Sequence, residues 1–550
     1  MTDTVAANEG HLPFAITLDV GSSLANETGS WRSERPIYED LLPPCNAQCP
    51  AGENIQQWLY YAEEGNYEAA WREIMVNNPL PATMGRVCYH TCETACNRAQ
   101  VDEAVGINAI ERFLGDKAIT EGWKVKKTAE PSGKKVLVVG SGPSGLSAAY
   151  HLSLLGHEVT VRDLGEKPGG MMRYGIPSYR LPRGVLDAEI RRIAEMGVVF
   201  EQNTRVDDVE VAMKEFDAVF TAVGAQIGKN VNVPAGAASK IMDAVDMLRG
   251  VEEGDEDIQP LLGRRVVVYG GGNTAVDAAR TAKRLGATES VILYRRTRDR
   301  MPAHDSEVQE AEEEGIKMRW LSTVNHVDGG VITIEKMELD ENGFPQPTGE
   351  FEELAADSLV MALGQESDLS LLEGVEGVEI ENGVVKVSSQ MMTGREGVFA
   401  GGDMVPAEKN VTVAIGHGKK AARYIDAWLR GATYVPPEIA QIATLDRMNT
   451  WYYSDAPKQV RERLEGVRRA SNFDEVVRGL DEESALFEAR RCMSCGNCFG
   501  CDNCFGVCPD NAVIKIKPGE YKFNYDYCKG CGVCAEECPC GAITMIPEEI

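Results

Sequence analysis

Two stretches of the chain repeat one pattern of hydrophobic and polar positions. Residues 134–139 form a short β-rich apolar run, a glycine-rich turn follows, and residues 146–155 then have a helical apolar spacing. A second unit begins with the apolar run 265–269 and continues through glycines into a helical pattern over residues 276–285. Two strand–glycine–helix units in one chain predict two α/β domains that bind nucleotides.

Length, composition and charge narrow the classes of function. A chain of 550 residues is too long for one hydrophobic core, because cores stop growing near ~250–300 residues. A formal charge of −29 disfavours binding to nucleic acid or to anionic lipid. No run of about 18 apolar residues occurs, and the sequence does not start with a basic and then apolar leader. We therefore expect a cytoplasmic protein with several domains.

The 16 cysteines lie in two groups at opposite ends of the chain. One group lies within residues 45–96 and the other within residues 492–540, and residues 97–491 contain none. In a cytosolic protein, so many cysteines favour metal ligation or redox chemistry over structural disulfides. The cysteine-free stretch argues against an enzyme of the thioredoxin reductase type, which needs a redox C-x-x-C beside its flavin.

The carboxy-terminal cysteines form two runs of the bacterial ferredoxin type. Both have the spacing C-x2-C-x2-C-x3-C-P, in which each [4Fe–4S] cluster takes three cysteines of one run and the fourth of the other. Structural zinc is the alternative, but zinc sites pair two separated C-x2-C knuckles instead of doubling a run of four. The predicted ligands are Cys498, Cys501, Cys504 and Cys508 in the first run and Cys528, Cys531, Cys534 and Cys538 in the second.

The first glycine-rich turn has the features of a dinucleotide site. Its G-x-G-x-x-G pattern alone is weak, but Asp163 ends the next strand, where an acid that binds ribose belongs. Glycines let the backbone approach a pyrophosphate, whose charge sits at the helix N-terminus. An α/β turn without a ligand is the alternative. The expected loop contacts are Gly140, Gly142, Pro143, Ser144 and Gly145.

The second turn has a basic sequence where an acid would favour NAD. Arg295 and Arg296 follow the strand after this turn, and their guanidinium groups suit a 2′-phosphate, so NADP(H) is favoured over NAD(H). A solvated basic turn is the alternative. The expected contacts of this domain are Gly270, Gly272, Asn273, Thr274, Ala275, Arg295, Arg296 and Arg300.

Further stretches, at residues 78–88, 167–182, 268–277 and 399–403, resemble one family of flavoproteins. The chain resembles the small subunit of glutamate synthase, the amino-terminal half of dihydropyrimidine dehydrogenase and the large subunit of NADH-dependent ferredoxin:NADP oxidoreductase. The resemblance implies FAD in the first nucleotide domain, NAD(P)H in the second, and a return of the chain to the FAD domain. It also implies flavin contacts at Gly170, Val206, Gly402 and Asp403.

The amino-terminal cysteines match that family only in part. They have x3 spacings, and the C-x2-C pair that usually precedes Cys45 is missing. The x3,x3 spacing also fails the C-x3-C-x2-C pattern of radical-SAM enzymes. The alternative is buried cysteines without a metal. The resemblance implies an inner cluster held by Cys49, Cys88, Cys92 and Glu111.

Residues 485–495 resemble the segment that, in the glutamate synthase relatives, supplies the missing pair. We hypothesise that Cys492 and Cys495 join Cys45 and Cys96 around a second cluster, split between the two ends of the chain. The alternative is that Cys492 and Cys495 extend the ferredoxin run without binding iron.

These features predict an α/β protein with two Rossmann-like domains, an amino-terminal α-helical iron–sulfur domain and a carboxy-terminal α+β ferredoxin domain. No functional role is expected for Glu307 and Glu312–Glu314, which are predicted to lie on a solvated helix face. The expected boundaries are 1–35 for a mobile arm, 36–130 for the helical domain, 131–255 with 365–435 for the FAD domain, 256–364 for the NAD(P) domain, 436–490 for a helical linker and 491–550 for the ferredoxin domain.

The expected activity is electron transfer between NADP(H) and one-electron carriers through FAD and [4Fe–4S] clusters. FAD is required because it exchanges electrons in pairs with a nicotinamide and singly with clusters. The expected partner is a ferredoxin or a catalytic oxidoreductase subunit, in a hetero-oligomer or dimer. The alternative is an obligate electron-transfer subunit, without a free acceptor, of a 2-oxoacid or aldehyde oxidoreductase or a glutamate synthase.

Overall fold

The chain folds into two units, which are described one at a time. The computed structural model describes residues 27–229, 231–236 and 239–548. The larger unit contains Cys45–Glu438 and Ala456–Cys492, and the smaller unit contains Met1–Pro44, Ile439–Asp455 and Met493–Ile550. Both ends of the chain therefore belong to the smaller unit.

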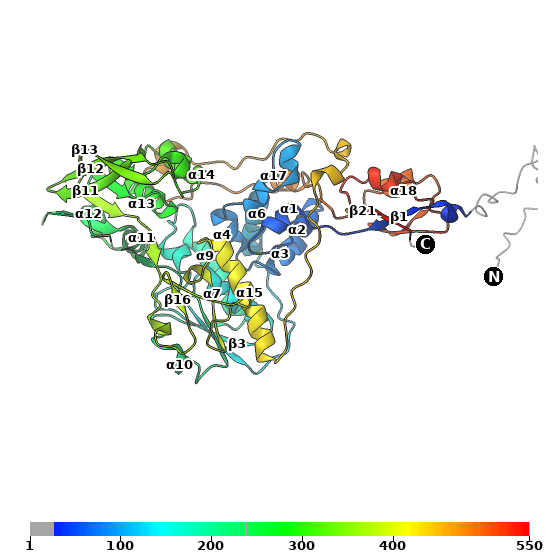
Figure 1. The fold of residues 1–550 in the computed structure, drawn as a ribbon, viewed down its shortest axis with the longest axis horizontal. Coiled ribbons are helices and arrows are strands. Elements are labelled where there is room, and N and C mark those ends of the chain that lie inside the picture. Colours follow the sequence, from blue (N-terminus) through cyan, green and yellow to red (C-terminus); the bar gives the residue numbers. More distant parts are fainter. Residues whose placement is uncertain (1–26, 230, 237–238, 549–550) are drawn as a thin grey trace, which may run out of the picture. The chain divides into compact units, whose positions relative to one another are not determined.

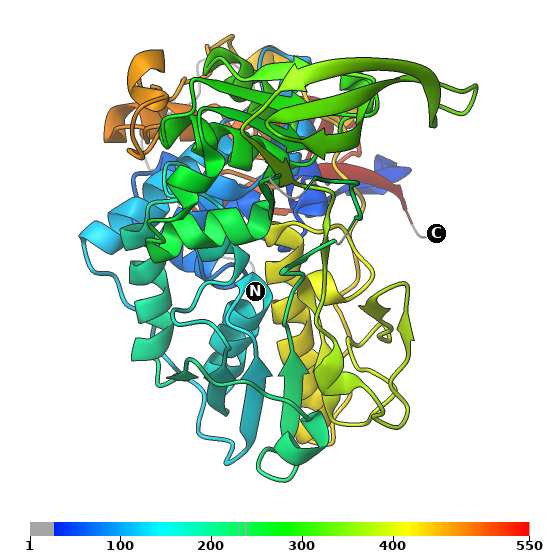
Figure 2. The same ribbon diagram turned by 90° about the vertical axis from the view of Figure 1, so that its left-hand side faces the viewer.

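In the larger unit, the first apolar run becomes the centre of a five-stranded parallel sheet with the order β18-β5-β2-β3-β4. The run is strand β2, and its last four residues are buried. Two helices pack on each other beside this sheet, α7 (Pro143–Leu154) and α15 (Val411–Leu429), as Figure 2 shows. The strands are β2 (Lys135–Val139), β3 (Glu158–Arg162), β4 (Val199–Glu201), β5 (Ala218–Thr221) and β18 (Val398–Ala400). Strand β18 brings the chain back to this domain after the second one.

The second apolar run is strand β8 of another five-stranded parallel sheet, with the order β10-β9-β8-β14-β7. Strand β7 begins at Ile241, so this domain starts ahead of the boundary expected at residue 255. The strands are β7 (Ile241–Asp243), β8 (Arg265–Tyr269), β9 (Glu289–Leu293), β10 (Lys317–Arg319) and β14 (Ser358–Met361), and the helices are α11 (Ala244–Glu253), α12 (Ile258–Leu262), α13 (Asn273–Arg284) and α14 (Asp305–Glu313).

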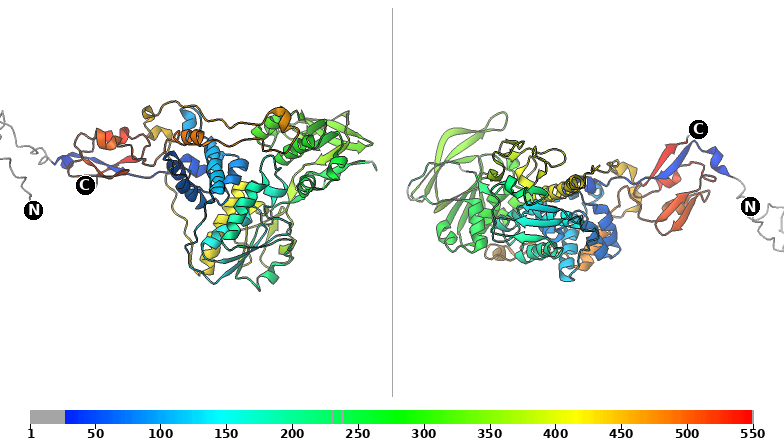
Figure 3. Two further views of the ribbon diagram at one scale, coloured as in Figure 1. Left: turned by 180° about the vertical axis from the view of Figure 1, so that it is seen from behind. Right: turned by 90° about the horizontal axis from the view of Figure 1, so that it is seen from below.

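Smaller strands extend this second domain. An antiparallel sheet of β11 (Ser322–Asp328), β12 (Val331–Leu339) and β13 (Pro345–Ala355) follows β10 in the chain and is visible in both views of Figure 3. A short antiparallel pair of β6 (Ile227–Gly228) and β15 (Gln365–Glu366) forms where the chain passes between the two nucleotide domains.

Short helices form the amino-terminal part of the larger unit. An apolar face is buried on α2, and Trp58 in it is fully enclosed; the face consists of Ile55, Trp58, Leu59 and Ala62. The helices are α1 (Pro44–Gln48), α2 (Ile55–Glu63), α3 (Tyr67–Met75), α4 (Pro81–Val87), α5 (Thr91–Thr94) and α6 (Ile107–Thr120).

The segment expected to be a helical linker is mostly not helical. Among residues 436–490, the structure has only the short helices α16 (Gly466–Arg469) and α17 (Glu482–Ala489) and two 3-10 turns. The Ala456–Cys492 segment instead binds the rest of the larger unit through charged side chains. Arg461 donates to the carbonyl of Gly85, and Lys458 pairs with Glu93 at 2.7 Å.

The smaller unit has a ferredoxin-like α+β fold that both ends of the chain complete. Strand β1 (Glu34–Tyr38) pairs in antiparallel register with β21 (Ile543–Pro547), as the blue and red strands of Figure 3 show. This differs from the expected mobile arm over residues 1–35, of which residues 1–26 lie outside the described residues. The other elements are β19 (Val513–Lys517), β20 (Glu520–Phe523), α18 (Asn503–Val507) and α19 (Val533–Glu536).

Candidate functional site

Both glycine-rich turns of the larger unit open onto one cavity. Its volume of about 690 Å³ suits a large cofactor or ligand, since such pockets span roughly 300–1,000 Å³. Of the residues that the sequence indicates, the cavity is lined by Gly140, Gly142, Pro143, Ser144, Asp163, Gly170, Gly270, Gly272, Asn273, Thr274, Arg295, Arg296, Gly402 and Asp403. Gly145, Val206, Ala275 and Arg300 do not line it.

The first turn has the shape that a dinucleotide needs. A Cβ on Gly145 would lie 1.9 Å from the carbonyl oxygen of Gly140, so this glycine allows close packing of helix α7 on the loop. A Cβ on Gly142 would meet only the Cα of Gly170, at 3.9 Å, so this position faces the cavity. The hydroxyl of Ser144 is buried and has no hydrogen-bond partner within the described chain. A pyrophosphate at this helix N-terminus would satisfy both features.

Asp163 binds the turn itself. Its carboxylate accepts hydrogen bonds from the Ser141 backbone amide at 2.6 Å and the Ser141 hydroxyl at 2.7 Å, and from the Gly165 amide at 2.7 Å. Asp163 therefore both lines the cavity and stabilises the loop. It directly follows the neighbouring strand β3, which ends at Arg162, one residue earlier than the sequence predicted.

The second turn is equivalent in shape and has partners that the sequence did not indicate. A Cβ on Gly272 would meet nothing within 4 Å, so this position is also open to the cavity. The amide of Asn273 donates to the hydroxyl of Tyr89 at 2.6 Å, and Tyr89 follows the predicted cluster ligand Cys88. Gln365 donates to the Thr274 hydroxyl at 2.9 Å. Ala275 is fully buried in the core of this domain.

The three arginines predicted to bind a 2′-phosphate separate into two groups. Arg295 and Arg296 line the cavity, and the Arg296 guanidinium lies 5.8 Å from the ring of Phe344. The Arg296 Nε is buried and has no hydrogen-bond partner in the described part of the chain. Arg300 instead lies on the surface beside Asp299 and Gly343. Two of the three guanidiniums are thus placed to bind a ligand in the cavity.

The residues implied by the resemblance lie around the first turn. A Cβ on Gly170 would lie 2.7 Å from the Cα of Gly142, which shows how closely these two loops approach each other. Gly402 has φ +73°, and its backbone amide donates a hydrogen bond to Nδ1 of His417 at 3.2 Å. Burial raises the pKa of Asp403, which lines the cavity. Val206 packs against the core of the first domain instead.

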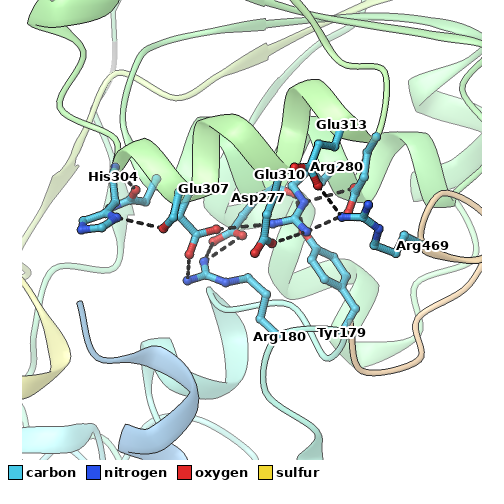
Figure 4. A network of polar contacts seen from close by, with 12 residues as sticks. Tyr179, Arg180, Asp277, Arg280, His304, Glu307, Glu310, Glu313 and Arg469 are labelled. Carbon is cyan, nitrogen blue, oxygen red and sulfur yellow. Dashed lines mark hydrogen bonds and ion pairs between the residues drawn. The ribbon is translucent and has the colours of Figure 1, made fainter. Parts of the chain in front are cut away.

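A buried ion-pair network joins the two nucleotide domains at the cavity wall (Figure 4). Arg180, from a loop of the first domain, donates to the Asp277 carboxylate on α13 at 2.7 and 2.9 Å and also pairs with Glu307 on α14. Burial raises the pKa of Asp277 to about 6, and the charge of Arg180 opposes that rise. The pairing links a loop of the first domain to two helices of the second at the cavity wall.

The expectation of a solvated face on α14 is confirmed for Glu312 and Glu313, which are exposed, but is wrong for Glu314. Glu314, directly after this helix, is buried and accepts hydrogen bonds from Arg280 and Arg284 at 2.6 to 3.1 Å. Glu307 bonds to Arg280 at 3.3 Å. Two arginines of α13 thus supply counter-charges that the spacing of glutamates does not reveal.

The thiols predicted to hold the inner cluster lie close together in the larger unit. Burial, and next the charge of Glu111, raises the pKa of Cys88 to about 12, and burial with the charges of Cys88 and Cys49 raises that of Cys92. Thr412, in the first turn of α15, donates to the Cys88 sulfur at 3.2 Å. The carboxylate of Glu111 is 6% exposed and accepts from Asn78 at 2.8 Å. The charges of Cys49, Cys88 and Glu111 thus act on one another, and Cys92 is influenced by both thiols.

Three of the four cysteines predicted for the outer cluster belong to the same unit. Cys45, Cys96 and Cys492 all pack against the apolar core formed by α2, α3 and α6. Cys495 belongs to the smaller unit.

The eight cysteines of the ferredoxin runs fall into two groups in the smaller unit. Cys498, Cys501 and Cys504 surround a small cavity together with Cys538 of the other run. Burial, with the charges of Cys528, Cys531 and Cys508, raises the pKa of Cys534 to about 12. The last cysteine, Cys540, is buried with its sulfur 3.8 Å from that of Cys538.

Within residues 27–229, 231–236 and 239–548, no three His, Cys, Asp or Glu side chains gather closely enough to hold one metal ion.

Two dinucleotide-type domains around one cavity, together with grouped thiols in both units, define an iron–sulfur flavoprotein oxidoreductase. A model of the pyridine nucleotide-disulphide oxidoreductase family matches residues 134–418, and the chain belongs to this family. A model of dihydropyrimidine dehydrogenase domain II, a 4Fe-4S cluster domain, matches residues 32–123, and one of the 4Fe-4S binding domain matches residues 521–544. The protein uses FAD, NAD(P)(H) and [4Fe–4S] clusters.

Several curated relatives are subunits of larger enzymes. The beta subunit of an NADP(+)-dependent formate dehydrogenase from Moorella thermoacetica is 35% identical over 83% of this chain and 71% of its own length. The beta subunit of an NADPH-Fe(3+) oxidoreductase from Geobacter sulfurreducens is 34% identical over 84% of this chain and 76% of its own. The small chain of glutamate synthase [NADPH] from Azospirillum brasilense is 32% identical over 72% of this chain and 89% of its own length.

Among the described residues, no helix combines the length and the apolar character that crossing a membrane requires.

Proposed function

We propose that this protein is the subunit of an assembly that oxidises NADPH or reduces NADP+. It exchanges single electrons with a ferredoxin or with a catalytic oxidoreductase subunit, in the cytoplasm. The observation that carries the proposal is the single cavity that both glycine-rich turns line. A nicotinamide held by one turn and a flavin held by the other would meet there. The names of three relatives, all subunits, support the assembly.

The residues of the chain have separable tasks in this proposal. The turn at Gly140–Gly145 would hold the FAD pyrophosphate, with Asp163 near the ribose, and Gly402 and Asp403 further along the cofactor. The turn from Gly270 to Thr274 would hold the second dinucleotide. FAD, when bound, supplies the conversion between paired and single electrons. Tyr89 contacts the second turn directly beside Cys88, so the inner thiols lie next to the cavity wall.

Selection of NADP over NAD is assigned to Arg295 and Arg296. Both line the cavity, and the buried Nε of Arg296 lacks a partner within the described residues. The oxygens of a 2′-phosphate accept hydrogen bonds from a planar guanidinium, and NAD lacks this phosphate. Arg300 is not included, because its side chain lies outside the cavity.

The proposed clusters are two in the ferredoxin runs, one at the inner site and one split cluster. Cys49, Cys88, Cys92 and Glu111 would hold the inner cluster. The packing of Cys45, Cys96 and Cys492 on one core supports three ligands of the split cluster. Cys495 follows Cys492 by three residues, which limits their separation to ~11 Å when the chain is extended.

The proposal is tested with anaerobically purified chain, free of partners. We expect one FAD and at least three clusters per chain, at about four irons each, and bleaching of flavin and clusters by NADPH. Fewer than about ten irons in fully reconstituted protein would refute the cluster count. Failure of NADPH to bleach the flavin would refute the assignment of the cavity.

The second candidate, an obligate module without a free acceptor, is favoured by the subunit names of the relatives. The two are separated by acceptor assays. Isolated chain that reduces ferredoxin supports the first candidate. Isolated chain that reduces viologen, but reduces ferredoxin only within a co-purified complex, supports the second.

A further inference from the structure

Tyr38 places its hydroxyl against the sulfur of a predicted cluster ligand in the smaller unit. The Tyr38 oxygen lies 3.2 Å from the Sγ of Cys504, and both side chains line the small cavity of the first ferredoxin run. The ring of Tyr38 is stacked on Phe523, with 4.6 Å between centroids and 16° between planes. Strand β1 and this stacking together fix where the hydroxyl points.

The direction of this hydrogen bond follows from the chemistry of a bound cluster. A cysteine that binds iron is a thiolate, which has no proton and can only accept. The phenol carries its proton at neutral pH and is therefore the donor. Hydrogen bonds to an ionised acceptor are roughly twice as strong as those between neutral groups.

We propose that Tyr38 raises the reduction potential of the cluster held by Cys498, Cys501, Cys504 and Cys538, through the hydrogen bond that it donates to Cys504. One-electron reduction adds a negative charge that spreads onto the sulfurs, so the bond stabilises the reduced cluster more than the oxidised one. Tyr38 itself transfers neither a proton nor an electron. It is a positioning residue that acts on the reduction potential of the cluster through Cys504.

This inference rests on the ferredoxin clusters of the proposed function but adds a residue from the opposite end of the chain. Tyr38 precedes Cys504 by 466 positions and lies outside both cysteine runs. A redox property of the carboxy-terminal domain would therefore depend on an amino-terminal strand.

The test is the Tyr38→Phe variant of the full chain with reconstituted clusters, studied by redox titration monitored by EPR. We expect unchanged iron and a several-fold to tenfold lower ratio of reduced to oxidised cluster at the same ambient potential, where tenfold corresponds to about 59 mV for one electron. The cluster that includes Cys528 serves as an internal comparison and should not move. The matched control is Tyr525→Phe, which removes a hydroxyl that donates to the Pro36 carbonyl at 2.9 Å in the same strand.

Full iron with an unmoved potential would overturn the inference, and so would equal shifts in both clusters or in the control. If Tyr38→Phe loses iron, wild-type chain labelled with 3-fluorotyrosine keeps the ring and makes the phenol a stronger donor. The potential should then rise, and an unmoved or lower value would overturn the inference. Wild-type chain that binds no ferredoxin-type clusters would instead refute the proposed function.

Discussion

Replacing Arg296 by alanine should weaken the use of NADPH while sparing NADH. The Nε of Arg296 is buried at the cavity wall without a protein partner among the described residues, so a 2′-phosphate would provide its hydrogen bond. A hydrogen bond to a charged group contributes about 1.5–3 kcal/mol. Since about 1.36 kcal/mol is tenfold in rate, kcat/KM for NADPH should fall roughly 10- to 150-fold. Arg295→Ala should act in the same direction.

The assay is anaerobic reduction of an artificial one-electron acceptor, with kcat/KM measured for both nucleotides. Arg298→Ala is the matched control, because Arg298 is exposed, lies outside the cavity and pairs with Glu312 at 2.7 Å. It should change neither value. Equal losses for NADPH and NADH in Arg296→Ala would refute the assignment, because they would show a role in binding both nucleotides.

Three further predictions concern other parts of the chain. The Cys492→Ser/Cys495→Ser double variant should lose about four irons and should no longer transfer electrons to ferredoxin, while NADPH still reduces the flavin. Full iron content together with full electron transfer would exclude the split cluster. Arg180→Met leaves Asp277 buried without its cation and should cost about 3–5 kcal/mol of stability. A lower melting temperature that Arg180→Met/Asp277→Asn does not recover would contradict this. Burial, and next the charge of Lys419, lowers the pKa of His151 to about 3, so only the unfolded chain gains this proton as pH falls below ~6.5. His151→Gln should therefore flatten the fall of the melting temperature between about pH 6.5 and 3, and an unchanged slope would count against it.

Local spacing was sufficient to predict the cavity loops. Gly140, Gly142, Gly270 and Gly272 were predicted from G-x-G patterns, which depend on backbone geometry, and all four line one cavity. The ferredoxin spacing likewise predicted that Cys538 joins the first run. In each case the contacts lie within, or between, short motifs.

Long-range pairing explains what the sequence did not reveal. The buried position of Glu314 depends on Arg280 and Arg284 of another helix, whereas the two residues before it, Glu312 and Glu313, are acidic. No sequence pattern beyond its place after Cys88 indicates a role for Tyr89, because its hydrogen-bond partner Asn273 lies far along the chain.

Strand pairing across the whole chain has a consequence for synthesis. Glu34 pairs with Pro547, so strand β1 leaves the ribosome long before its partner β21 exists. At ~5–20 residues per second, the interval is on the order of 25–100 s. Throughout that time β1 has an unpaired edge, of the kind that recruits other strands. A nascent chain therefore cannot complete its ferredoxin-like unit before β21 has been synthesised, and β1 must stay unpaired, or be shielded, until then.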